Sequence, residues 1–371
     1  SAHFHPADVG VYFGAPGVEV EDPYFEGKGP RRVGCTDCGA CMTGCRVGAK
    51  NTLDLNYLYL AERLGVQVLP ETEVLAVRPD EGGYRVETRG SLDRKRRADY
   101  RAARVVFAGG VMGTIPLLLA MREDPKGLPR LSARLGRSVR TNSESVTVIG
   151  TRNDEEVDYT RGVAITSILH TDEHSHLEPV RYGKGATFFR KLLFPHSTKT
   201  TLMGRLLAVA KAYAKDPVDW AHSFFAGDNR KGAILVFMRS IDESLGLTLK
   251  KKLFGRKVLA TEVDDPASAP TANLAEAAAL SQRFADKTNG LISSMFSESL
   301  LGKPTTAHIL GGACMGRDAS EGAIDAQHRL FGYDGLYVID GSTVSANPGV
   351  NPSLTITALA ERAMSLIPAK R

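Results

Sequence analysis

Four of the chain's five cysteines stand within one short segment, where their sulfur atoms could bind a metal centre. They are Cys35, Cys38, Cys41 and Cys45, with two, two and three residues between them. This is the spacing of a bacterial ferredoxin run, except that Arg46 stands where such a run has proline. In two-cluster ferredoxins the fourth cysteine serves a second cluster, so the run alone does not complete a site. Zinc usually takes cysteine pairs separated by a longer loop. Three interpretations are open: an iron–sulfur cluster, a zinc ion or free thiols.

A glycine turn between an apolar strand and a helix could face a phosphate group. The strand is Val105–Ala108, the turn contains Gly109, Gly110 and Gly113, and the helix is expected over Ile115–Arg122. Helix N-termini bind anions through their unsatisfied N–H groups, and glycine lets a ligand approach the backbone closely. This pattern is half of a dinucleotide-binding βα unit, and a plain crossover is the alternative.

The C-terminal residues combine a histidine in HILGGACMG, a buried strand ending in an Asp-Gly-Ser turn, and the segment NPGVNPSL. His308 is the histidine, and it could transfer a proton. A helix is expected to open at about Pro352, with Asn351 at the N-cap and the proline at N1.

Around these residues the pattern changes along the chain. Residues 1–34 read as an extended surface segment, residues 53–64 as a helix that Gly65 ends, and residues 66–69, 74–77 and 84–88 as strands. Residues 146–300 alternate strand-like runs with two helices, which indicates an α+β domain with an antiparallel sheet. The runs are 146–150, 164–170, 233–238, 247–252 and 257–262, and the helices are 202–215 and 274–289.

Length and charge limit the class of protein. A chain of 371 residues usually holds two domains, and 43% hydrophobic residues are ordinary for a globular protein. The net charge of +5 lies in short runs that read as solvated hairpin faces, so nucleic-acid binding is not expected. The start of the chain lacks the pattern of a signal peptide, which favours a cytoplasmic location. Because Ser1 reads as an internal position of a longer protein, a signal ahead of it is the alternative.

Four segments together resemble the bacterial, cholesterol oxidase-like branch of the glucose–methanol–choline (GMC) FAD oxidoreductases. They are GACMTGCRVGAKNTLDLNYLYLAE, FAGGVMGTIPLLL, HILGGACMG and YVIDGSTVSANPGVNPSLTITALAER. The resemblance runs in order from about Gly29 to Pro368 and is strongest over 301–371. One departure is that the chain has no GxGxxG motif, so it resembles the C-terminal two-thirds of a complete enzyme.

The resemblance implies roles for single residues. His308 would hydrogen-bond the alcohol oxygen and assist proton removal, and Asn351 would orient the substrate and contact the flavin. FAD contacts are implied at Val74, Gly109, Gly110, Asp340, Gly341, Asn351 and Pro352. Glu178 stands in the right order to move a steroid double bond, with an ordinary exposed or salt-bridged carboxylate as the alternative. Some flavin dehydrogenases of the superfamily carry a cluster in a cysteine-rich segment, which keeps the iron–sulfur interpretation open for Cys35–Cys45.

The expected architecture is an incomplete α/β FAD-binding domain plus an α+β substrate domain. Residues 1–145 and 301–371 would belong to the first, and residues 146–300 to the second. The expected activity is FAD-dependent oxidation of a bulky secondary alcohol such as a sterol, with transient membrane contact to extract it and possible double-bond isomerisation. A dehydrogenase that sends electrons through an iron–sulfur cluster, and an FAD-free remnant without activity, are the alternatives.

Overall fold

The chain alternates between two units in the computed structural model, which describes residues 3–152, 156–225, 229–252, 255, 257–272 and 274–368. Unit 1 comprises Ser1–Val68, Glu144–Met238 and Thr271–Thr305. Unit 2 comprises Leu69–Ser143, Arg239–Pro270 and Thr306–Arg371. The expected boundaries near 145 and 300 lie close to two of these changes, but residues 1–68 group with unit 1 and residues 239–270 with unit 2.

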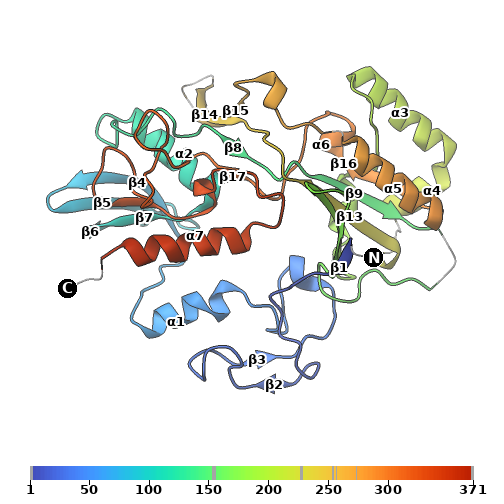
Figure 1. The fold of residues 1–371 in the computed structure, drawn as a ribbon, viewed down its shortest axis with the longest axis horizontal. Helices are drawn as coiled ribbons and strands as arrows, with labels where there is room; N and C mark the ends of the chain where they lie inside the picture. Colours follow the sequence, from blue (N-terminus) through green and yellow to red (C-terminus); the bar gives the residue numbers. More distant parts are fainter. Residues whose placement is uncertain are drawn as a thin grey trace. The chain divides into compact units, whose positions relative to one another are not determined.

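Unit 1 is built on a seven-stranded sheet in the order β1-β10-β11-β13-β9-β16-β12 (Figure 1). Pairs β1–β10, β10–β11, β9–β13, β9–β16 and β12–β16 are antiparallel, which confirms the expected antiparallel sheet. The strands are β1 (Phe4–Pro6), β9 (Ser145–Gly150), β10 (Ser167–His170), β11 (Ser175–Val180), β12 (Leu193–Pro195), β13 (Gly232–Arg239) and β16 (Leu291–Met295).

Four helices accompany this sheet: α3 (Leu202–Lys215), α4 (Pro217–Phe225), α5 (Ala275–Thr288) and α6 (Phe296–Ser299). Helix α5 packs on β9 and β16. It buries Ala277, Ser281 and Ala285, which are four residues apart and therefore form one stripe. Because these three side chains are small, α5 can lie close to the sheet. The Ser281 hydroxyl lies 2.7 Å from the hydroxyl of Thr147. Short helices η3 (Phe188–Leu192) and η4 (Asn229–Lys231) complete this part of the unit.

The N-terminal segment of unit 1 is mostly irregular. It contains β2 (Glu19–Val20), β3 (Arg32–Val33), η1 (Ala40–Met42), η2 (Leu53–Leu55) and α1 (Tyr57–Arg63). The expected helix over 53–64 is therefore split into η2 and α1, and Gly65 follows with a φ of 90°. The expected strand at 66–69 is wrong, because these exposed residues pair with no strand among the described residues.

Unit 2 contains the βα turn and the C-terminal helix. Its strands are β4 (Thr72–Asp80), β5 (Gly83–Gly90), β6 (Arg97–Ala102), β7 (Val105–Phe107), β8 (Val139–Arg140), β14 (Gly246–Lys251), β15 (Lys257–Glu262), β17 (Leu310–Gly311) and β18 (Leu336–Val338). Its helices are α2 (Gly110–Glu123), η6 (Pro266–Ser268), η7 (Gly341–Thr343) and α7 (Ser353–Leu366). Strands β7 and β18 form a parallel pair, as the α/β expectation requires, and β4, β5 and β6 form an antiparallel sheet.

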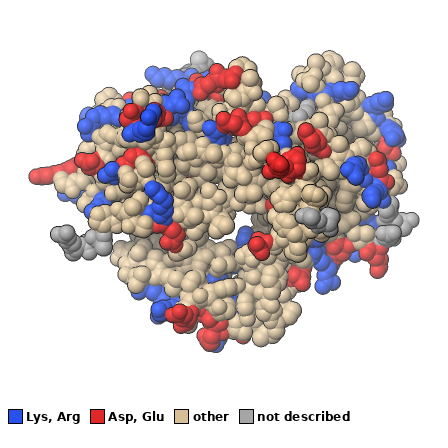
Figure 2. Space-filling view, in the orientation of Figure 1, with Lys and Arg blue, Asp and Glu red and all other residues tan. Residues whose placement is uncertain are grey.

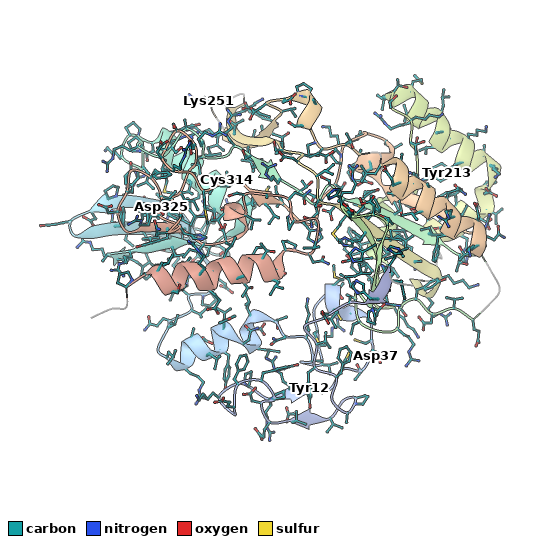
Figure 3. All side chains as sticks on the ribbon, viewed as in Figure 1. Tyr12, Asp37, Tyr213, Lys251, Cys314 and Asp325 are labelled. Carbon is teal, nitrogen blue, oxygen red and sulfur yellow. The ribbon has the colours of Figure 1, made fainter. Side chains whose placement is uncertain are left out.

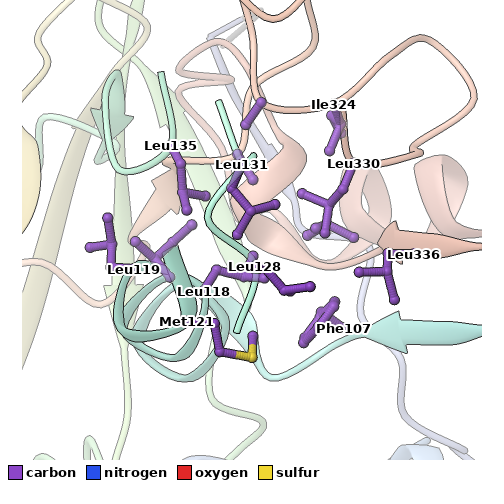
Figure 4. Packing of buried hydrophobic residues seen from close by; sticks show 14 of the residues in the cluster. Phe107, Leu118, Leu119, Met121, Leu128, Leu131, Leu135, Ile324, Leu330 and Leu336 are labelled. Atoms are coloured by element: carbon purple, nitrogen blue, oxygen red, sulfur yellow. The ribbon is translucent and has the colours of Figure 1, made fainter. Parts of the chain in front are cut away.

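Helix α2 supplies much of the core of unit 2 (Figure 4). Ile115, Leu118 and Leu119 lie on one face of α2 and are at most 2% exposed. They pack in one cluster with Phe107 of β7 and Leu336 of β18. The core thus fixes the start of α2 against the end of the β7–β18 pair.

Helix α7 begins one residue later than expected. Pro352 is its N-cap and provides no side-chain cap, so the expected N-cap role of Asn351 is wrong. None of the helices in the described ranges combines the length and apolar character needed to cross a bilayer.

Candidate functional site

Asp340 ties the end of β18 to the start of α2. One carboxylate oxygen accepts hydrogen bonds from the Gly110 N–H at 2.9 Å and the Thr114 hydroxyl at 2.5 Å. The other accepts from the N–H of Ser342 at 2.8 Å and its hydroxyl at 2.5 Å. A carboxylate has about four acceptor positions, so protein donors occupy all of them. The negative charge also lies at the N-terminus of α2, where the helix dipole stabilises it.

Gly341 lies between the two segments that carry His308 and Asn351. A Cβ at Gly341 would stand 3.4 Å from Cδ2 of Leu310 in β17 and 3.3 Å from Cδ1 of Ile356 in α7. His308 precedes β17 by two residues and Asn351 precedes α7 by two residues. The glycine therefore lets the strand after His308 and the helix after Asn351 pack closely.

The loop before Asn351 is held by backbone and amide hydrogen bonds. Asn142 donates to the Val350 carbonyl at 2.8 Å. Asn347 donates to the Arg239 carbonyl at 2.8 Å and accepts from the Gly349 N–H at 2.8 Å. These contacts fix the approach of the chain to Asn351, which is half-buried, as is His308.

The glycine turn at the start of α2 is open on its outer side. Gly110 has a φ of 68°, and a Cβ at Gly110 or Gly113 would meet no described atom within 4 Å. The N–H of Gly109 donates to the Thr114 hydroxyl at 3.0 Å, and the N–H of Gly110 donates to Asp340. Because both donors are used within the protein, a ligand would approach the Cα side of this turn.

Val74 lies at an irregularity of β4. The register with β5 shifts between Val74 and Ala76, and Val74 is 39% exposed. Such bulges redirect the strand and often occur beside binding sites. The implied contact of Val74 with FAD stays a prediction, as do the other implied FAD contacts.

Glu178 belongs to unit 1 and is buried, with 2% of its surface exposed. On β11, its carboxylate lies 3.2 Å from Nε2 of His176, which is also buried. The His176 ring also lies beside that of His170, with the ring centroids 5.8 Å apart and the planes tilted by 52°. Glu178 is thus a paired, buried carboxylate and not an exposed one.

Glu298 was not expected from the sequence, because nothing local marks it. It lies on α6 in unit 1 and is 2% exposed. Its pKa is raised to about 7, chiefly by burial and also by the nearby charge of Glu144, while a hydrogen bond from the Thr305 N–H acts in the opposite direction. A carboxyl group that titrates near neutrality suits proton transfer, so Glu298 is a candidate acid or base. Glu178 and Glu144 are buried as well, and the pKa of about 7 is what marks Glu298 as the candidate.

The four clustered cysteines line one hollow in unit 1, together with Val11, Thr36, Gly39, Ala40, Val47, Ala49, Lys50 and Gly162. All five cysteines of the chain are free thiols. Burial raises the pKa of Cys35. Burial also acts to raise the pKa of Cys45, but hydrogen bonds from backbone N–H groups, first that of Lys50, hold it below its usual value. Within the described ranges, no three His, Cys, Asp or Glu side chains are arranged around one metal ion.

Comparison with known proteins identifies relatives over nearly the whole chain. The chain is 41% identical over 391 residues to a cholesterol oxidase of Mycobacterium tuberculosis (strain ATCC 25618 / H37Rv), covering 98% of the chain and 65% of that protein. It is 38% identical over 401 residues to a cholesterol oxidase of Acinetobacter baumannii, covering 99% of the chain and 68% of that protein. The chain therefore spans about two thirds of the length of these relatives.

Solved structures share the fold at low identity. Pyridoxine 4-oxidase from Mesorbium loti has a TM-score of 0.52 at 13% identity, over 86% of this chain and 62% of that one. A formate oxidase has a TM-score of 0.51 at 14% identity, over 83% of this chain and 62% of that one. Residues 256–360 match the family model described as GMC oxidoreductase. The chain belongs to the GMC oxidoreductase family.

Proposed function

We propose that this chain carries the substrate-binding and proton-transfer residues of an FAD-dependent oxidase acting on a sterol-like secondary alcohol. The observation that carries the proposal is the match to two proteins named cholesterol oxidase along 98% and 99% of the chain. The matched region includes His308, Asn351 and the glycine turn.

GMC oxidoreductases bind FAD, and the open glycine turn of unit 2 fits a cofactor approaching its backbone. Gly110 and Gly113 leave room where any other residue would place a Cβ. FAD, when bound, would supply the acceptor for the hydride of the carbinol carbon, a chemistry that no side chain provides. Gly109, Gly110 and Gly341 would border it, and Asp340 would hold these segments in place.

His308 and Asn351 act on the alcohol in this proposal. His308 accepts the hydroxyl proton or hydrogen-bonds the oxygen while the proton departs. Its backbone is fixed by the hydrogen bond from its N–H to the Thr306 hydroxyl at 3.0 Å. Asn351 orients the substrate through its amide, on a loop that Asn142 and Asn347 hold. Positioning of this kind reduces the entropy cost of reaching the reactive geometry.

We assign the further isomerisation step to Glu178. A ketone acidifies the neighbouring C–H bond, so a carboxylate can remove that proton and return it further along the double bond. Glu178 is buried, and Nε2 of His176 lies 3.2 Å from its carboxylate and would hold it in position. If Glu178→Gln still formed the conjugated ketone at the wild-type rate, this assignment would be wrong.

We also propose that unit 1 touches a lipid surface through an apolar patch on η3, α3 and α4. Its exposed side chains are Phe188, Phe189, Leu202, Met203, Leu206, Leu207, Val218, Phe224 and Phe225. Helices α3 and α4 contact each other, and α4 contacts η3. Cations lie nearby: Lys191 Nζ is 4.1 Å from the Phe224 ring centroid, and Figure 2 shows uncharged surface with Lys and Arg over α3 at its upper right. Apolar side chains bordered by cations suit an anionic membrane surface.

Vesicle binding tests the patch. Leu207→Glu should reduce co-sedimentation with phosphatidylcholine–phosphatidylserine vesicles, because it places a charge in the apolar patch. The control is Leu64→Glu, since Leu64 is 88% exposed and lies outside η3, α3 and α4. Equal losses in both variants, or none in either, would contradict the proposal.

A second candidate is a dehydrogenase that passes electrons from the flavin through an iron–sulfur cluster. The observation that favours it is the hollow lined by all four clustered cysteines. Oxygen electrodes distinguish the two: an oxidase consumes oxygen and releases hydrogen peroxide, whereas the dehydrogenase requires an added electron acceptor.

The main test uses the purified chain with added FAD. A flavin absorption band after gel filtration and peroxide release with detergent-solubilised cholesterol are the expected results. A folded chain that retains no flavin would overturn the proposal for this chain. Retained flavin without turnover of any sterol would overturn the substrate assignment.

A further inference from the structure

We propose that His176 and His170 carry protons between the buried carboxylate of Glu178 and solvent, and that His5 sets which nitrogen of His170 takes part. The proposal rests on the isomerisation that we assign to Glu178, and it adds the route by which that carboxylate exchanges its proton. His5 and His170 are exposed, whereas His176 and Glu178 are 4% and 2% exposed. The row therefore leads from the surface into the interior of unit 1.

The pairing of three neighbouring strands places these four side chains on one face of the sheet. His5 on β1 lies opposite Ile168 of β10, and His170 is two residues further along β10. His170 lies opposite His176 of β11, and Glu178 is two residues beyond His176. Since side chains alternate between the faces along a strand, residues two apart share a face. Figure 3 draws the side chains of all three strands as sticks.

Hydrogen bonds at His5 fix the tautomer of His170. Nδ1 of His5 lies 2.9 Å from the carbonyl oxygen of Pro6, which only accepts, so this nitrogen carries the proton. In the neutral ring Nε2 of His5 is then the acceptor, and Nε2 of His170, 3.2 Å away, is the donor. The two rings are also stacked, with their centroids 5.3 Å apart. The basic nitrogen of neutral His170 is therefore Nδ1.

The rings of His170 and His176 are neighbours across the β10–β11 pair. Their centroids are 5.8 Å apart and their planes are tilted by 52°. Side chains that lie directly opposite in an antiparallel pair have Cβ atoms about 4.5–5.5 Å apart, so the contact follows from the strand register. A proton crosses a gap of this size through one water molecule, as in general acid–base catalysis.

His176 and Glu178 form the buried end of the row. Nε2 of His176 lies 3.2 Å from Oε1 of Glu178. Val180, the next residue on this face of β11, packs in an apolar cluster with Val236 and Met238. A carboxylate in such surroundings needs a hydrogen-bond partner. An imidazole nitrogen donates to the ionised carboxylate and accepts from the protonated acid, so His176 suits both states of Glu178.

The transfer is balanced at each step. Protonated Glu178 gives its proton to Nε2 of His176, while Nδ1–H of the same ring gives its own proton to Nδ1 of His170. The exposed His170 cation then releases that proton to a solvent water molecule. The sum is one carboxylic acid and one water giving one carboxylate and one hydronium ion, with no electron transferred. The reverse sequence brings a proton in from solvent.

This route gives isomerisation a measurable signature. A proton that Glu178 has taken from the steroid either returns to the steroid or leaves along the histidines and is replaced from solvent. In deuterium oxide the replaced proton is a deuteron. The γ-carbon of the conjugated ketone, which receives the proton, should therefore carry deuterium.

The experiment supplies the full chain with cholest-5-en-3-one in deuterium oxide, without FAD, because this isomerisation moves no hydride. Ultraviolet absorption follows the conjugated ketone, and nuclear magnetic resonance measures deuterium at its γ-carbon at early reaction times. The measured quantity is deuterium per molecule of conjugated ketone, so a change of rate alone does not alter it. We expect the wild-type chain to form a ketone that carries deuterium.

Glutamine variants interrupt the row, because glutamine forms hydrogen bonds but does not relay a proton. His176→Gln and His170→Gln should lower the deuterium per ketone at least about tenfold. Since His170 is exposed, its replacement leaves the His176–Glu178 contact in place and tests the relay even where His176→Gln loses turnover. His174→Gln, exposed between β10 and β11, is the control and should match the wild-type chain. Circular dichroism establishes that each variant is folded.

The outcomes separate the relay from the isomerisation. Wild-type deuterium per ketone in His170→Gln, an equal loss in His174→Gln, or conjugated ketone without deuterium from the wild-type chain would overturn the relay and leave the isomerisation assigned to Glu178. A folded wild-type chain that forms no conjugated ketone would overturn both. Alcohol oxidation is measured separately by peroxide release, so neither result bears on it.

Discussion

The carboxylate of Asp340 accepts a hydrogen bond from the backbone N–H of Gly110, although the two residues are 230 positions apart in the chain. With the contact to the Thr114 hydroxyl, it joins the end of β18 to the first turn of α2. The geometry of the glycine turn therefore depends on a residue of the C-terminal segment.

Replacing Asp340 by alanine should lower the free energy of unfolding by about 2–4 kcal/mol, because buried hydroxyl and N–H donors lose their acceptor. Urea denaturation measures this loss. Asp334→Ala is the control, since Asp334 is exposed and its hydrogen bond from the Tyr84 hydroxyl is to the backbone carbonyl, which alanine keeps. Similar stability of both variants would show that the Asp340 contacts contribute little.

Gly113→Ala tests where the cofactor approaches. Gly113 lies in α2, and a Cβ there meets open space, so alanine should stabilise the helix by about 0.5–1 kcal/mol. The new methyl group would occupy space that a bound FAD needs, so the affinity of the chain for FAD should fall. Thermal unfolding and flavin titration give the two readouts. Unchanged FAD affinity would place the cofactor elsewhere.

His308→Gln should reduce turnover by about 10²–10⁴-fold while any bound flavin stays bound, because glutamine keeps a hydrogen bond but cannot accept the proton. Peroxide release and the flavin spectrum are measured on the same sample. His174→Gln is the control, since His174 is exposed in a loop of unit 1. Wild-type turnover in His308→Gln would refute the assignment.

Glu298 should make stability fall as the pH rises. Burial raises its pKa from 4.5 to about 7. Between about pH 4.5 and about pH 7 the folded state binds more protons than the unfolded state. The stability that protonated Glu298 contributes is therefore fully present below about pH 4.5 and is lost as the pH rises through about 7. The pKa difference corresponds to roughly 3 kcal/mol.

Glu298→Gln removes the ionisation and should flatten the dependence of unfolding free energy on pH. Glu276→Gln, a substitution at an exposed position of α5, should leave that dependence unchanged. Urea denaturation at about pH 5 and about pH 8 makes the comparison. An equally steep loss of stability in Glu298→Gln would show that another group causes it.

Gly349→Ala should disturb the loop before Asn351. Gly349 has a φ of 64°, and a Cβ would stand 2.7 Å from the backbone N of Ser240. A backbone atom cannot move out of the way as the end of a flexible side chain can. The loop must therefore shift, which should lower the free energy of unfolding by about 1–3 kcal/mol. Gly185→Ala has no such contact and serves as the control. Unaltered stability and turnover would mean that the loop position is unimportant.

Local patterns predicted the elements that depend mainly on their own residues. Helix α3 has the expected bounds, and strands β9, β13, β14 and β15 lie within a residue of expectation. The segment 66–69 failed because a strand requires a partner, and its apolar residues have none among the described strands. The N-cap of α7 is Pro352 and not Asn351, on a loop that Asn142 holds through the Val350 carbonyl, a contact that no local capping pattern contains.

The sequence by itself indicated the family and the antiparallel sheet, and it named His308, Asn351 and the four cysteines as candidate site residues, because motif spacing and periodicity are local properties. Only the tertiary structure decided that Asp340 holds the glycine turn, that His176 pairs with Glu178, and that burial tunes Glu298. These facts depend on contacts and solvent exclusion between distant segments, and no local pattern encodes the dielectric around a carboxylate.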